Sequence, residues 1–294
     1  MVERLTRSRV IFNILNIGLI ALFCIICLAP MWHVFMSSIS DPRTLMMTTG
    51  INWLPVGDIQ WRAYQMVLSN RGILTGYINT IIYVSAGTLL GLVLTAIAGY
   101  VLSCKSKLRG PLMTMIVITM MFSGGLIPSY IVNMSLGLID NRLSVIIPGA
   151  TNAFFIIIMK NAFEQLPESF AESAKLDGAG PLRILINILL PMVKATLAVI
   201  ALFLIMLRWN SWFHEAIYLS RSRDLWPLQL VMREILVQRD VTTVTAGEAA
   251  AMANLMVQPI RNAVTIVGTL PILFVYPFIQ KYFVAGITLG GVKG

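Results

Sequence analysis

Long apolar stretches, nearly free of charged residues, alternate with shorter polar segments along the chain. A helix needs about 20 mostly apolar residues to cross the hydrocarbon core of a bilayer. By this measure the pattern predicts six transmembrane helices, over residues 10–38, 75–103, 111–132, 143–162, 182–207 and 259–282. We therefore expect an all-α, polytopic membrane protein whose residues 1–294 form a single transmembrane domain.

The third predicted span is interrupted by residues that break helices. Ser123, Gly124 and Gly125 are followed by Pro128, which has no backbone N–H to donate. Inside a membrane, non-helical backbone persists only where it is buried in protein or lines a water-filled cavity. The interruption therefore favours a segment that lines a pathway, with a kink that serves packing alone as the alternative.

Composition excludes a soluble enzyme. Only 12% of the 294 residues are charged and 57% are hydrophobic, whereas about 25% of the residues in a typical soluble domain are charged. The net charge is +9, but no segment resembles a nucleic-acid-binding module, and Lys and Arg are common in the cytoplasmic loops of membrane proteins. We expect membrane lipid, and no nucleic acid, among the partners.

The distribution of cations predicts the orientation of the chain. An even number of spans places both termini and the loop over residues 163–181 on one side of the membrane. Short cytoplasmic loops are enriched in Lys and Arg, and the segments predicted for the opposite side contain arginine but no lysine. We therefore predict that both termini and the 163–181 loop are cytoplasmic.

The sequence contains no arrangement typical of a catalytic site. His33 and His214 lie in different outer segments, without a nucleophile or metal-ligand spacing near either, so we interpret both as interfacial polar residues. A phosphate-binding loop of the GxxxxGK[ST] type is also missing from the sequence. We predict that the chain is not an enzyme and holds no catalytic residue, cofactor or metal; if ATP drives the protein, another chain binds it.

The most informative polar stretch is the 163–181 loop, which contains Glu172 to Gly178 with the sequence ESAKLDG. Ser169 and Glu172 have the spacing of a capping box at a helix start, and Gly178 can end the helix in a left-handed conformation. Pro191 follows inside or at the edge of the next apolar span. The pattern predicts a short amphipathic helix beside the membrane, with an ordinary connector between two spans as the alternative.

This stretch resembles the EAA loop in permease subunits of ATP-driven (ABC) importers. In that family the loop forms a coupling helix that docks into a cleft of the ATPase subunit, and Ser173 stands where the family usually has alanine. The resemblance implies a type I importer permease fold with a cytoplasmic coupling helix. It assigns ATPase coupling to Glu172, Ser173, Ala174, Leu176, Asp177, Gly178 and Pro191.

Three further stretches resemble carbohydrate-importer permeases. Residues 208–212 (RWNSW) are similar to the Trp-Asn segment of sugar importers, and residues 122–130 (FSGGLIPSY) to the lplC-like and alginate-importer branch. Residues 282–294 are similar to the C-terminal tail of maltose-type, MalG-like permeases, which reaches between the ATPase subunits. For residues 208–212 the alternative is a pair of interfacial aromatic residues beside a helix end. For residues 282–294 the alternative is a flexible basic tail.

These resemblances imply functional roles for individual residues. The implied tail contacts with the ATPase are Gly290 and Lys293. The candidates for the translocation pathway are Tyr130, Asn133, Trp209, Asn210 and Trp212.

The resemblance covers nearly the whole chain and implies a permease subunit of a carbohydrate importer in the inner or plasma membrane of a bacterium. The implied partners are a second homologous permease, two ABC ATPase subunits that bind ATP and Mg²⁺, and an extracytoplasmic solute-binding protein. This chain would form half of the translocation pathway for an oligosaccharide. A membrane scaffold or sensor that recruits an ATPase without forming a sugar pathway is the alternative.

The outer arginines and the lplC-like stretch together favour an acidic oligosaccharide, such as an alginate or another uronate-containing glycan. Arg142, Arg208, Arg221 and Arg223 are among these arginines, and guanidinium groups pair with carboxylates in a planar, bidentate way. Acidic residues such as Glu215 share the region, so contacts between these arginines and partner proteins are the alternative.

Overall fold

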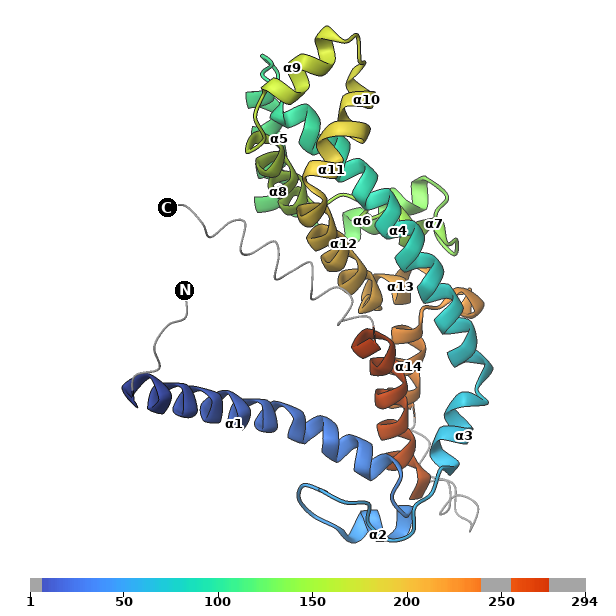
Figure 1. The fold of residues 1–294 in the computed structure, drawn as a ribbon. Helices are drawn as coiled ribbons and strands as arrows, with labels where there is room; N and C mark the ends of the chain where they lie inside the picture. The colour runs from blue at the N-terminus through green and yellow to red at the C-terminus, as the bar shows by residue number, and fades with distance from the viewer. Residues whose placement is uncertain (1–6, 239–254, 275–294) are drawn as a thin grey trace. The chain divides into compact units, whose positions relative to one another are not determined.

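The computed structural model describes residues 7–238 and 255–274, and every regular element among them is helical (Figure 1). The chain divides into two compact units, one formed by residues 1–71 and 232–270 and the other by residues 72–231 and 271–294. The helical architecture agrees with the expected all-α fold.

The first unit contains α1 (Arg7–Ser38), α2 (Pro42–Met47), α3 (Arg62–Leu68), the end of α14 (Leu228–Gln238) and most of a helix over Leu255–Phe274. Apolar side chains of α1 are exposed on all sides between Ile11 and Leu28, as expected for a helix that lipid or another membrane chain surrounds. Asp41 caps α2, because its Oδ2 accepts hydrogen bonds from the hydroxyl of Thr44 at 2.6 Å and from its backbone N–H at 3.0 Å. These bonds lower the pKa of Asp41.

The second unit contains α4 (Arg71–Ser103), α5 (Arg109–Met121), α6 (Leu126–Ser135), α7 (Leu143–Ile146), α8 (Ala153–Glu164), α9 (Ser169–Leu176), α10 (Pro181–Ile184), the π-helical turn η1 (Leu185–Leu189), α11 (Leu190–Met192), α12 (Lys194–Trp209), α13 (Phe213–Tyr218) and the 3-10 turn η2 (Arg223–Leu225). Glycines let neighbours approach α4 closely. A Cβ atom at Gly91 would lie 2.9 Å from the carbonyl oxygen of Ala150, and one at Gly99 would lie 2.8 Å from Cγ of Met159.

The third and fifth predicted spans are bent helix pairs rather than straight helices. α5 and α6 meet at 116°, and the segment Pro181–Met192 meets α12 at 87°. At the first bend Gly125 has a φ of 81°, a left-handed conformation that glycine adopts at little cost. At the second, Pro191 follows the π-helical turn, and both features interrupt the regular backbone hydrogen bonds of a helix.

The expected continuous helix over residues 143–162 is also interrupted, because a loop over residues 147–152 separates α7 from α8. Pro148 lacks the N–H that a helix would use, and Gly149 has a φ of 71°. Asn152 then caps α8 by accepting a hydrogen bond from the N–H of Phe154 at 2.9 Å. The apolar flanks on both sides hide this break from hydropathy.

Among the described residues, three helices are long and apolar enough to cross a membrane by themselves: Ser8–Ser38, Arg71–Ser103 and Leu255–Phe274. The number rises to five if each bent pair is one span. The predicted fourth span is represented by the short helix α8, and the predicted sixth span is described as far as residue 274.

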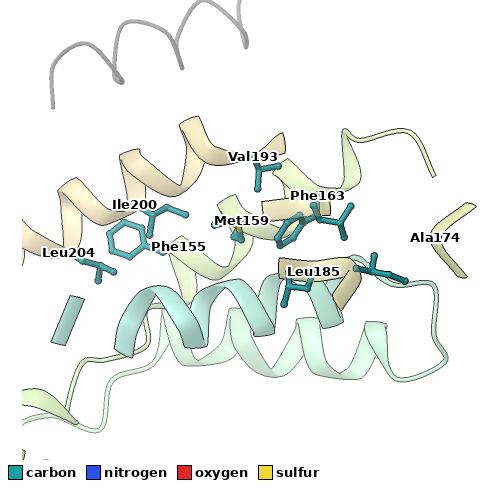
Figure 2. Close-up of a cluster of buried hydrophobic side chains, with 10 residues drawn as sticks. Phe155, Met159, Phe163, Ala174, Leu185, Val193, Ile200 and Leu204 are labelled. Atoms are coloured by element: carbon teal, nitrogen blue, oxygen red, sulfur yellow. The ribbon is translucent and has the colours of Figure 1, made fainter. Parts of the chain in front are cut away.

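One hydrophobic cluster connects α9 to the spans of the second unit (Figure 2). Its members are Phe155, Met159 and Phe163 of α8, Ala174 of α9, Ile184 of α10, Leu185 and Leu189 of η1, Val193, and Ile200 and Leu204 of α12. Met159, Ile184 and Ile200 are fully buried. The loop helix is therefore packed into the same core as α8 and α12.

Candidate functional site

The helix α9 occupies the loop for which the sequence predicts an amphipathic helix. Its end is a Schellman motif, in which the N–H of Gly178 donates to the carbonyl of Lys175 at 3.0 Å and the N–H of Ala179 to that of Ala174 at 2.9 Å. Gly178 has a φ of 77°. The predicted left-handed glycine at this helix end is confirmed.

The start of α9 differs from the predicted capping box. Glu168 is the N-cap residue, Ser169 is the first helical residue, and no side chain makes a capping hydrogen bond. The carboxylate of Glu168 instead binds Lys105, whose Nζ lies 2.6 Å from Oε1 and 2.9 Å from Oε2. This hydrogen-bonded carboxylate raises the pKa of Lys105, and the pair joins the start of α9 to the turn between α4 and α5.

A second carboxylate attaches the same turn to the end of α8. Glu164 binds Arg109 through Oε1 and Lys160 through Oε2, the latter at 2.8 Å. The segment between α8 and α9 is therefore linked to the α4–α5 turn at both of its ends. The side chains of Lys105 and Glu168 are 76% and 64% exposed, and exposed ion pairs contribute little to stability, so the main effect of this pair is on position.

The side chains of α9 form one buried and one exposed face. Ala174 is buried in the hydrophobic cluster, so it packs inside this chain rather than on its surface. Leu176 is 90% exposed and Phe170 is 45% exposed. The other predicted coupling residues on this loop, Glu172, Ser173, Asp177 and Gly178, are exposed as well, whereas Pro191 lies apart in α11. The predicted tail contacts Gly290 and Lys293 lie outside the described residues.

A cavity of about 750 Å³ lies within the second unit, lined by α4, α6, α7 and the loop after it, α12 and α13. Its polar lining residues are Thr80, Tyr83, Ser129, Asn133, Ser144, Thr151, Asn152, Arg208, Ser211, His214, Glu215 and Tyr218. The volume falls in the range of small-molecule sites, roughly 300–1,000 Å³. So many hydroxyl, amide and charged groups suit a strongly polar ligand.

The five predicted pathway residues occupy different surroundings. Asn133 lines the cavity, and Tyr130 stacks on the lining residue Tyr218 with 6.4 Å between ring centroids. Tyr130 itself and the other three lie outside the lining. Trp209 is buried with its ring 6.4 Å from that of Tyr77, Asn210 donates to the carbonyl of Met206 at 2.9 Å, and Trp212 packs on Phe213.

Two charged residues, Arg208 and Glu215, also line the cavity. The sequence alone groups both with the other charges of the outer segments. Nη1 and Nη2 of Arg208 donate to the carbonyl oxygens of Val145 and Ile146 at 2.8 and 3.1 Å. Glu215 is buried, and its Oε1 accepts a hydrogen bond from the hydroxyl of Ser211 at 2.7 Å. The sequence signal that could have identified these two cavity residues is that Arg208 and Glu215 follow the end of an apolar span.

The two histidines have separate surroundings. Nδ1 of His33 accepts a hydrogen bond from the N–H of Asn52 at 2.9 Å, which connects α1 to the loop beyond it. His214 lines the cavity, with its ring 5.9 Å from that of Tyr218. Within residues 7–238 and 255–274, no three His, Cys, Asp or Glu side chains form a group that could hold a metal ion.

Comparisons with known proteins identify relatives over almost the full chain. Residues 87–289 match the family described as binding-protein-dependent transport system inner membrane component. The polygalacturonan/rhamnogalacturonan transport system permease protein YtcP of Bacillus subtilis strain 168 is 36% identical over 288 residues, which cover 97% of this chain and 99% of YtcP. Protein LplC of the same organism is 40% identical over 233 residues, covering 79% of this chain and 78% of LplC.

A solved structure shares the fold. One chain in the crystal structure of a bacterial ABC transporter involved in the import of the acidic polysaccharide alginate matches with a TM-score of 0.83 and 34% identity, over 96% of this chain and 99% of that chain. The resemblance to the lplC-like and alginate-importer branch is confirmed, as is the expected importer permease fold. The chain therefore belongs to the family of inner membrane components of binding-protein-dependent transport systems.

Proposed function

We propose that this chain is the permease subunit of an ABC importer for oligosaccharides and forms half of the translocation pathway beside a second, homologous permease. One observation carries the proposal: a single unit holds both an exposed loop helix suited to an ATPase and a polar cavity suited to a sugar. The similarity to YtcP over the full chain supports it. A scaffold or sensor that only recruits an ATPase would have no use for the cavity.

In this proposal α9 is the coupling helix. Two ABC ATPase subunits bind ATP and Mg²⁺ and close, and the cleft that receives α9 moves with them. Leu176 and Phe170 supply exposed apolar surface for that cleft, since exposed apolar groups commonly mark contact sites. The spans then open outward and accept an oligosaccharide from the solute-binding protein, and ATP hydrolysis resets them. Gly290 and Lys293 would add tail contacts with the ATPases.

We infer an acidic oligosaccharide, of the alginate or uronate type, as the substrate. YtcP is named for polygalacturonan and rhamnogalacturonan transport, and the solved relative takes part in the import of alginate. The arginines give less support than the sequence suggested, because most are engaged within the chain. Arg208 binds two carbonyl oxygens, Arg142 donates to Oδ1 of Asn79 at 3.2 Å, and Arg223 lies 5.1 Å from the ring centroid of Trp226.

The substrate class can be tested in proteoliposomes that hold both permeases and both ATPase subunits, with the binding protein added. We expect trimeric uronates to stimulate ATP hydrolysis several-fold more than neutral trisaccharides of equal length. Equal or stronger stimulation by the neutral sugars would remove the acidic preference and leave an oligosaccharide importer. Lack of stimulation by any saccharide would contradict the proposed function as a whole.

We also propose that both termini and α9 are cytoplasmic. Cys24, Cys27 and Cys104 are exposed and unbridged, so labelling needs a background in which all three are replaced by alanine. In that background, we expect Ser220→Cys to react with a membrane-impermeant maleimide in intact cells, and Ser173→Cys to react only after permeabilisation. Both serines are exposed, so accessibility within the fold does not limit either reaction. Labelling of position 173 but not 220 in intact cells would reverse the orientation.

A further inference from the structure

One buried carboxylate oxygen of a cavity-lining residue has no partner in the described part of the chain. Glu215 is 5% exposed and lines the cavity, and its Oε1 is satisfied by the hydroxyl of Ser211. Its other oxygen, Oε2, is buried and finds no hydrogen-bond donor among the residues that the structure describes. Roughly 90% or more of buried polar groups in proteins have a partner, so an unpaired carboxylate oxygen in a cavity wall indicates a donor that comes from outside the chain.

The cation in the same cavity does not supply that donor. Both Nη groups of Arg208 already donate to the carbonyls of Val145 and Ile146. The Nε–H of Arg208 is buried and has no partner among the described residues either, so it does not donate to Oε2 of Glu215.

The chemistry of a carboxylate defines the group that can bind. An ionised carboxylate has acceptor oxygens only, so it takes a hydroxyl or amide N–H and repels another carboxylate. Among the remaining lining residues, Ser129, Ser144 and Asn133 already donate to the backbone carbonyls of Gly125, Asn141 and Ser129, so their oxygens are left as acceptors. Acceptor oxygens of this kind suit a ring that carries several hydroxyl groups.

We propose that Oε2 of Glu215 accepts a hydrogen bond from a sugar hydroxyl as the oligosaccharide passes through the cavity. The inference rests on the proposed importer function and adds a specificity-determining residue to it. For a uronate substrate, Glu215 selects the orientation in which a hydroxyl edge faces this wall and the sugar carboxylate faces away. Glu215 therefore recognises the hydroxyl groups of an acidic sugar rather than its carboxylate.

The test pairs variants of Glu215 with trigalacturonates that each lack one hydroxyl. Uptake into proteoliposomes is measured for wild type, Glu215→Ala and Glu215→Gln, with the same binding protein throughout. A hydrogen bond to a charged group contributes about 1.5–3 kcal/mol, so we expect at least one deoxy sugar to be taken up about 10- to 100-fold less efficiently by wild type. In Glu215→Ala that penalty should disappear, because the partner of the missing hydroxyl is already gone.

Asp224→Asn is the matched control, because it removes a carboxylate charge from an exposed side chain of the same segment outside the cavity lining. This variant should keep the wild-type penalty for every deoxy sugar. If Glu215 only stabilises the fold, Glu215→Ala lowers the uptake of all sugars by the same factor. Each deoxy sugar then keeps the uptake loss, relative to the full sugar, that it shows in wild type, and this result overturns the proposal. If Glu215→Ala does not assemble, Glu215→Gln decides, since a weaker acceptor should reduce the same penalty. Absence of saccharide uptake by the wild-type complex would instead reject the importer function.

Discussion

Replacing Gly178 with leucine is expected to abolish uptake while the subunit still reaches the membrane. Gly178 ends α9 with a φ of 77°, and a residue with a Cβ pays roughly 1–2 kcal/mol in that conformation. A Cβ there would meet nothing within 4 Å among residues 7–238 and 255–274. The effect therefore comes from a changed helix end and from bulk at the surface offered to the ATPase, rather than from a clash in the fold.

Two variants separate these causes. Gly178→Asn tolerates the left-handed conformation better than leucine, so it should retain part of the uptake. Gly180→Leu introduces the same bulk nearby at a position with an ordinary φ and open space, and should retain most of it. Uptake is measured at equal membrane expression, together with the ATPase activity that the binding protein stimulates. Wild-type uptake by Gly178→Leu would reject the assignment of this loop to coupling.

Replacing Arg208 with alanine is expected to destabilise the second unit and prevent uptake. The change leaves the carbonyls of Val145 and Ile146 without their donors and leaves the buried Glu215 without its nearby cation. Leaving a buried acceptor without its donor costs roughly 1–3 kcal/mol, a sizeable part of the total stability of about 5–15 kcal/mol that is typical of proteins. Lysine at position 208 keeps the charge but not the planar fork that reaches two carbonyls, so it should be intermediate.

Thermal unfolding of the purified complex in detergent measures the effect on stability, and uptake measures the effect on transport. Arg221→Ala is the control, because this arginine is exposed and typical surface substitutions change stability by less than about 0.5 kcal/mol. If the thermal unfolding midpoint of Arg208→Ala equals that of Arg221→Ala, the two hydrogen bonds from Arg208 to carbonyl oxygens do not stabilise the fold.

Local sequence signals predicted some features of the loop helix and missed others. The glycine at position 178 specifies the end of α9 because its backbone conformation is a local property. The start of α9 depends on a residue far away in sequence: Glu168 binds Lys105, and no capping box forms. Ala174 likewise turns inward because the cluster that receives it is assembled from α8, η1 and α12, which the pattern of one helix cannot reveal.

Around the cavity, too, some features were visible in the local sequence and others were not. The helix break at residues 123–125 was visible as glycines and a proline, whereas the break near Pro148 was hidden by the apolar residues around it. Asn133, one of the predicted pathway residues, lines the cavity, whereas the rings of Trp209 and Trp212 in the RWNSW stretch lie beside those of Tyr77 and Phe213. Arg208 and Glu215 come together at the cavity only after the chain leaves α12 and turns back through α13.

The burial of Ala174 gives the second unit a mechanical property. Because Ala174 shares one hydrophobic cluster with Ile200 and Leu204 of α12, a displacement of α9 would also disturb side chains that pack on α12. The 16 residues of α12 form a helix about 24 Å long. Arg208 lies near the far end of α12, so in the proposed function a displacement of the coupling helix by an ATPase subunit would also move a wall of the cavity.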